Sequence, residues 1–195
     1  QIYFKNGMDI SALMLATNNG HIACLQALLD AKADANTKAP NGTSVLMMAC
    51  KENHSECARI LIAAKADVKA KLNESKKTAL MVAAEKDHHQ CLELLMNARA
   101  EINAKDKNGA SALFYAAKKG QLSCVKLLVD AKADMGSITL DGYSALLIAA
   151  TDNHPECVKV LLAAEADVNA KGNRGVSAIM MAAAKNNLAC VQLLV

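Results

Sequence analysis

A short motif that recurs every 33 or 34 residues constrains this sequence more than any other feature. The motif begins with Ser or Thr and occurs six times, as SALMLA from Ser11, SVLMMA from Ser44, TALMVA from Thr78, SALFYA from Ser111, SALLIA from Ser144 and SAIMMA from Ser177. Cysteine follows the same period, at Cys24, Cys57, Cys91, Cys124, Cys157 and Cys190. An interval of this length is typical of repeat proteins, in which each unit packs mainly against its neighbours.

Each unit is predicted to contain two short helices separated by a polar break. The Ser or Thr at its start is of the type that caps a helix N-terminus. Helices below about 12–15 residues are marginal alone in water, so stacking of the units must bury their apolar stripes. The chain is 53% hydrophobic but only 3% aromatic, and about a fifth of it is Ala, which favours closely spaced helices. We therefore expect an all-α solenoid of stacked helix-turn-helix units.

The repeats resemble the ankyrin repeat family. The resemblance rests on the 33-residue period, the Ser/Thr-Ala-Leu opening, the Asn-Gly or Asp-Gly loops and the ADVNA segment at 166–170. It covers residues 5–195 and implies helix pairs with projecting hairpin-like loops. The units expected within this single array of residues 1–195 are approximately 5–37, 38–71, 72–104, 105–137, 138–170 and a truncated 171–195. We expect the chain to be part of a longer protein, because neither end resembles a polar cap.

The sequence departs from the family pattern at three places. The Thr-Pro-Leu-His motif becomes Ser/Thr-Ala/Val-Leu/Ile followed by an apolar residue, which predicts packing by Met47, Met81 and Met180 instead of a polar network. The glycine that ends the second helix is replaced, by Lys32, Lys65, Arg99, Lys132 and Glu165. The segment LNESKK before Thr78 contains the one-residue insertion and no Gly, so this loop is expected to deviate most.

A His-x-x-Cys pair recurs at the start of four second helices, at His21/Cys24, His54/Cys57, His88/Cys91 and His154/Cys157. Two such ligands on one helix face suggest zinc. The alternative is that His fills a structural position and Cys a small apolar core position, and we favour it because two units have Gln121 and Asn187 in place of His. No metal site is predicted. The seven cysteines, an odd number without a CxxC pair, fit free thiols in a reducing interior.

Several functional classes find no support in the sequence. No phosphate-binding loop, paired-carboxylate motif or metalloprotease motif is present, so we expect neither catalysis nor a cofactor. The net charge of +3 and the scarcity of aromatic residues argue against nucleic acid. The chain contains neither an apolar run long enough to span a membrane nor a secretory signal.

A binding face can be placed by counting from the Ser or Thr of each unit. The resemblance assigns recognition to the loop tips and the exposed end of the first helix, taken here as positions minus six, minus four, minus three, minus one, plus seven and plus eight. Twelve of these positions are basic: Lys5, Lys38, Lys51, Lys77, Lys86, Lys105, Lys107, Lys118, Lys119, Lys171, Arg174 and Lys185. Five are acidic: Glu52, Glu74, Glu85, Asp141 and Asp152. The predicted face therefore has a net charge of +7.

The predicted contact patch lies chiefly in units three to six. Ile138, Leu140 and Tyr143 are apolar at positions expected to be exposed, although Ile138 and Leu140 would lose that role if they folded back onto their own hairpin. The residues expected to bind a partner are Lys77, Lys105, Lys107, Lys118, Lys119, Leu140, Tyr143, Asp152, Arg174 and Lys185. Apolar side chains beside basic ones suit an acidic protein surface with an apolar element.

We therefore predict a non-catalytic protein-interaction or scaffold module inside the cell, in the cytoplasm or on the cytoskeleton. Two alternatives remain open. The array is a structural spacer or assembly component that associates through its uncapped ends, or it is the targeting domain of a longer enzyme.

Overall fold

A computed structural model describes residues 11–195 of the chain. It confirms the all-helical prediction, because the described residues contain helices and isolated bridges but no strand. The helices are α1 (Ala12–Asn18), α2 (Ile22–Asp30), α3 (Val45–Lys51), α4 (Ser55–Ala63), α5 (Ala79–Glu85), α6 (His89–Asn97), α7 (Ala112–Lys119), α8 (Leu122–Asp130), α9 (Ala145–Thr151), α10 (Pro155–Ala163), the 3-10 turn η1 (Asn173–Gly175), α11 (Ala178–Ala184) and α12 (Leu188–Leu194). Among these residues no helix has the length and apolar character that crossing a membrane requires.

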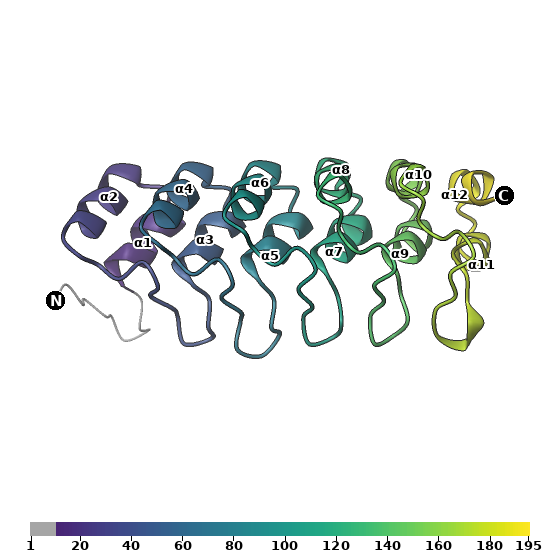
Figure 1. Cartoon of the computed structure of the whole chain (residues 1–195), viewed down its shortest axis with the longest axis horizontal. Coiled ribbons are helices and arrows are strands. Elements are labelled where there is room, and N and C mark those ends of the chain that lie inside the picture. The colour runs from purple at the N-terminus through teal and green to yellow at the C-terminus, as the bar shows by residue number, and fades with distance from the viewer. Residues whose placement is uncertain (1–10) are drawn as a thin grey trace. The chain divides into compact units, whose positions relative to one another are not determined.

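The chain divides into two compact units. Among the described residues, the first comprises 11–83 and 90–101, and the second comprises 84–89 and 102–195. Within each unit the second helices of successive pairs form one row, the first helices form another, and the loops that precede the first helices project to one side (Figure 1). The repeat period of the sequence thus appears as a repeated helix pair.

The repeated hydroxyl residues begin the first helices, as predicted. The hydroxyl oxygen accepts a hydrogen bond from the backbone N–H three residues on in five repeats, at Ser11, Ser44, Thr78, Ser111 and Ser144, over 3.1–3.3 Å. Ser177 makes no such bond. Each bond satisfies one backbone donor that the first helical turn leaves without an intrahelical partner.

The second helices end without glycine. The residues that replace it are left-handed, with φ of 66° at Lys32, 65° at Lys65, 62° at Arg99, 60° at Lys132 and 64° at Glu165. At the end of α10, for example, the N–H of Glu165 donates to Leu162 O and the N–H of Ala166 donates to Leu161 O. This pair of bonds is the Schellman motif, so the cap geometry survives although the glycine is absent.

Leucines at one position of the second helices form the centre of the buried rows. Leu61, Leu95, Leu128 and Leu161 are completely buried. The cysteines were predicted to be core as well, and six of the seven are buried. Cys24 is the exception and is exposed, and Met180 is 57% exposed although it was predicted to fill the core. Those two expectations were wrong, because neither residue is covered by a neighbouring helix pair in the described structure.

At four of the second helices, the residue before the helix bonds back to the preceding repeat. The rings of His54 and His154 contact the carbonyl oxygens of Asn18 at 3.0 Å and Lys118 at 3.1 Å. A carbonyl can only accept, so Nε2 carries the proton in both histidines. In the second unit Gln121 and Asn187 donate in the same way to the end of the preceding first helix. These bonds account for His54 and His154 as structural links between repeats.

The loops before the first helices follow one plan with local variations. In the loop before Thr78, Lys71 and Thr78 still form the closing bridge, and Lys76 is left-handed with φ of 59°. The inserted residue is accommodated inside the turn. The loop before Ser177 also deviates, because it contains η1 with left-handed Arg174 at φ of 60°.

Candidate functional site

The second unit contains a groove of about 530 Å³ between its loops and the first helices α7, α9 and α11. Position plus four of the repeat contributes Tyr115, Ile148 and Met181 to its apolar lining, and Phe114 adds a second ring from α7. The two rings pack edge to face, with centroids 5.9 Å apart. The groove therefore has an apolar floor of aromatic, aliphatic and thioether groups, which suits an apolar side chain of a ligand.

Charged side chains line the same groove at the ends of the three first helices. Lys118 is in the last turn of α7, Asp152 directly follows α9, and Lys185 directly follows α11. All three are exposed, and their charged groups form no ion pair with any residue in the described part of the chain. A helix C-terminus stabilises a cation but disfavours a carboxylate, so helix stability does not explain Asp152.

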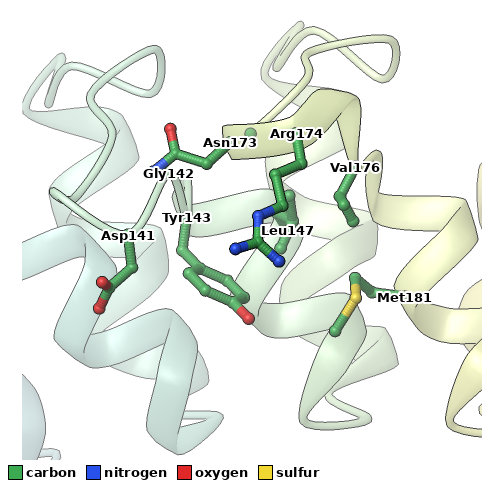
Figure 2. A pocket seen from close by; sticks show the side chains of 9 residues that line it. Asp141, Gly142, Tyr143, Leu147, Asn173, Arg174, Val176 and Met181 are labelled. Atoms are coloured by element: carbon green, nitrogen blue, oxygen red, sulfur yellow. The ribbon is translucent and has the colours of Figure 1, made fainter.

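A second hollow of about 490 Å³ adjoins this groove and shares Asp141, Tyr143 and Met181 with it. Figure 2 shows the Tyr143 ring and the Arg174 side chain directed into this hollow, Tyr143 from the hairpin before α9 and Arg174 from the loop that contains η1. Arg174, Tyr143 and Met181 thus place a guanidinium, an aromatic ring and a thioether on the lining of one hollow. Such a surface suits a carboxylate next to apolar groups.

A buried polar contact holds the hairpin before α7. The hydroxyl of Tyr115 donates to Asp106 Oδ2 at 2.7 Å, and Asp106 Oδ1 accepts from the N–H groups of Asn108 and Ala110, each at 2.8 Å. Burial, with the Asp106 hydrogen bond and charge as further causes, holds the pKa of Tyr115 well above its usual range. The hydroxyl therefore stays protonated and continues to donate at neutral pH.

Bonds between adjacent hairpins order the rim of the groove. The N–H of Leu140 donates to Asn108 O at 2.8 Å, and the side-chain amide of Asn173 donates to Leu140 O at 2.9 Å. The backbone of Leu140 is thus bonded on both sides while its side chain is 74% exposed. The alternative in which Leu140 folds back onto its hairpin is wrong, and Ile138 is 46% exposed as well.

The predicted binding residues divide into two sets. Lys118, Tyr143, Asp152, Arg174 and Lys185 line the two hollows of the second unit. Lys105, Lys107, Lys119 and Leu140 are exposed in the same unit but line neither hollow, and Lys77 is half-buried in the first unit. Lys5 lies outside the described residues.

Counting outward from the cap missed the floor of the groove, because position plus four was not included. The sequence does contain a signal for it. Position plus four is apolar in all six repeats, as Leu15, Met48, Val82, Tyr115, Ile148 and Met181. Leu15 is 49% exposed and Met48, Val82 and Met181 are half-buried, whereas Tyr115 and Ile148 keep only 8% and 7% of their surface. A repeated apolar position that keeps some accessible surface indicates a binding floor more specifically than the charges do.

Six of the seven cysteines have the environment of core residues, Cys24 being the exception. Burial raises the pKa of Cys124 to about 12 and that of Cys157 to about 11, so both thiols are unreactive at neutral pH. Within residues 11–195 no three His, Cys, Asp or Glu side chains lie close enough together to hold a metal ion. His54 and His154 thus bond one repeat to the next, and Cys57, Cys91 and Cys157 are packed in the core.

Comparison with known proteins agrees with the helix pairs. The family model described as ankyrin repeats (3 copies) matches residues 2–71, 65–139 and 113–195. The chain belongs to the ankyrin repeat family, whose repeats mediate protein–protein interaction. No curated protein matches the chain.

Proposed function

We propose that the chain is a non-catalytic protein-binding module that engages an acidic partner through the groove of its second unit. One observation carries this proposal: an apolar floor lies directly beside lysines that have no carboxylate partner among the described residues. An apolar anchor beside accessible charge is the arrangement that gives a protein interface its affinity and its salt dependence. A preformed groove also lowers the ordering cost of association. We also infer that the module lies inside the cell, in the cytoplasm or on the cytoskeleton.

The test uses ligands selected from a displayed library of random peptides on the immobilised chain. Lys118→Glu with Lys119→Glu is expected to weaken the selected ligands about tenfold or more and to flatten the salt dependence of Kd, because two attractive charges become repulsive. Lys126→Glu with Lys159→Glu is the matched control. It makes the same charge change on exposed residues of α8 and α10 that do not line the groove.

Two results contradict the proposal. One is unchanged affinity in the Lys118→Glu, Lys119→Glu variant. The other is equal weakening by the control pair, which would mean that binding follows net charge alone. Circular dichroism of both variants shows whether helix content is intact.

An assembly role is a second candidate, and one observation favours it. Met180 is 57% exposed and Leu188 is 66% exposed in the last helix pair, whereas Met47, Met81 and Leu147 at the repeat position of Met180 are buried. An apolar surface of this kind can associate with another helix pair.

A further inference from the structure

We propose that the groove of the second unit recognises an extended peptide with an aromatic residue that carries a hydrogen-bond donor, Trp or Tyr, and with an acidic residue three positions before it and another three positions after it. This inference rests on the proposed function and specifies the partner at the same site. It follows from the order of charges along the groove and from the spacing of the repeats.

The order of charges is basic, acidic, basic across three successive repeats. Lys118 belongs to the repeat of α7, Asp152 to that of α9 and Lys185 to that of α11. All three line one groove, and none has an ion-pair partner in the described residues. Arg174 adds a second basic group in the repeat of α11, and Asp141 adds a second acidic group in that of α9. A complementary ligand therefore presents an acidic side chain to Lys118, a hydrogen-bond donor to Asp152 and a second acidic side chain to Lys185.

The spacing of the repeats sets the spacing of the ligand. Packed helices have axes about 8–10 Å apart, so one repeat advances roughly that distance along the stack. An extended peptide in the polyproline II conformation advances about 3.1 Å per residue, and its three residues per turn bring every third side chain back to the same face. Three peptide residues thus span about one repeat, and the two acidic side chains fall about six residues apart. A helical ligand, with a rise of about 1.5 Å per residue, would need a much longer separation.

The centre of the groove selects the residue between the acids. Tyr143, Ile148 and Met181 present apolar surface there, while the carboxylates of Asp141 and Asp152 lie on the same lining. A purely aliphatic side chain would leave these carboxylates without a donor. A Trp or Tyr side chain offers an apolar body to the floor and an N–H or O–H at its edge.

The test uses a synthetic peptide of sequence Asp-Gly-Ser-Trp-Gly-Ser-Asp with blocked termini. The chain contains no Trp, so tryptophan emission reports the peptide alone. Titration with the 195-residue protein is expected to shift this emission to the blue as the indole enters the apolar groove. The isomer Gly-Asp-Ser-Trp-Ser-Asp-Gly has the same composition but places the acids two positions from Trp, and we expect its Kd to be about tenfold higher.

Reversing the charge of two groove lysines identifies the residues that bind the acidic side chains of the peptide. Lys118→Glu with Lys185→Glu is expected to lose the acidic peptide and to bind Lys-Gly-Ser-Trp-Gly-Ser-Lys instead. The control pair Lys126→Glu with Lys159→Glu, which makes the same net charge change outside the groove, is expected to keep the original preference. Recovery of binding by a changed partner cannot come from unfolding.

The outcomes separate this inference from the proposed function. Equal Kd values for the two acid spacings overturn the proposed register. Peptides in which Leu or Lys replaces Trp are measured by competition against the Trp peptide. Tighter binding of either one overturns the assignment of Trp or Tyr to the central position. If library ligands depend on Lys118 but lack the pattern, the inference fails and the proposed function stands. If no ligand depends on the groove, both fail.

Discussion

The hydrogen bond between the Tyr115 hydroxyl and Asp106 distinguishes one repeat from its neighbours. Asp106 is a buried acidic side chain that accepts two backbone N–H groups of its own hairpin and the hydroxyl of Tyr115 on α7. Because both residues are nearly buried, a missing partner would leave a desolvated polar group. The contact fixes the hairpin before α7 beside the aromatic floor of the groove.

Tyr115→Phe is therefore expected to lower the free energy of unfolding by about 1.5–3 kcal/mol, the range for a hydrogen bond to a charged group. Tyr143→Phe serves as the control and is expected to cost less than about 0.5 kcal/mol, because Tyr143 is only half-buried. Urea unfolding at neutral pH measures both. Equal losses in the two variants would contradict a special role for the Asp106 contact.

The same contact predicts a pH dependence. The pKa of Tyr115 is raised in the folded chain, chiefly by burial, so the unfolded chain loses this proton first as the pH rises. Stability from Tyr115 is complete below the unfolded pKa of about 10 and declines above it. The stability difference between wild type and Tyr115→Phe should therefore shrink above about pH 10. A difference that stays constant to higher pH would contradict this assignment.

At the scale of the element, the second helices end in a strained conformation that the sequence does not relieve. A left-handed residue with a Cβ is less favourable than glycine by about 1–2 kcal/mol. The lysines and the arginine at this position have a partial compensation, because a cation is favourable at a helix C-terminus. Glu165 has the same left-handed φ of 64° and places a carboxylate there instead. The end of α10 is therefore the least favourable of these helix ends.

Glu165→Gly is accordingly expected to raise the free energy of unfolding by about 0.5–1 kcal/mol, after allowing for the greater backbone entropy of glycine in the unfolded chain. Glu165→Lys separates the two causes, since it removes the unfavourable charge and keeps the strain, and its gain should be smaller. Lys132→Gly, which loses a favourable cation at the end of α8, should also gain less. Thermal unfolding ranks the three variants, and a destabilised Glu165→Gly would contradict the strain argument.

At the scale of the whole molecule, the chain consists of two compact units whose cores have equivalent leucines. Leu61 of α4 and Leu161 of α10 occupy the same repeat position, and both are completely buried. In repeat arrays each unit contacts its neighbours only, so a local loss of packing is expected to stay local. This predicts that stability is distributed along the chain and not held by one common core.

Leu61→Ala and Leu161→Ala are each expected to cost about 2–5 kcal/mol, the usual range for a leucine removed from a packed core. Hydrogen exchange read by mass spectrometry should show the loss of protection within the first unit for Leu61→Ala and within the second for Leu161→Ala. Equal loss over all described residues in both variants would show that the chain unfolds as one cooperative body. If the loss of packing stays local, Leu161→Ala should weaken peptide binding to the groove more than Leu61→Ala does.

The sequence by itself determined the helix pairs, because Ser11, Ser44 and their equivalents cap helices through bonds only three residues long. Family membership followed from the period, since each unit buries its stripe only against its neighbours. The charged rim was also predictable in part, as Lys118, Asp152 and Lys185 recur near the ends of first helices.

Only the tertiary structure decided which repeated positions form one site. The floor at position plus four becomes a groove because the hairpins stand beside the first helices, and bonds such as Leu140 N–H to Asn108 O connect residues about a full repeat apart. Whether a cysteine such as Cys24 is buried depends on the helix pair beside it, not on its own unit. Burial and grooves depend on neighbours distant in sequence, whereas caps and helix ends depend on residues three or four positions away.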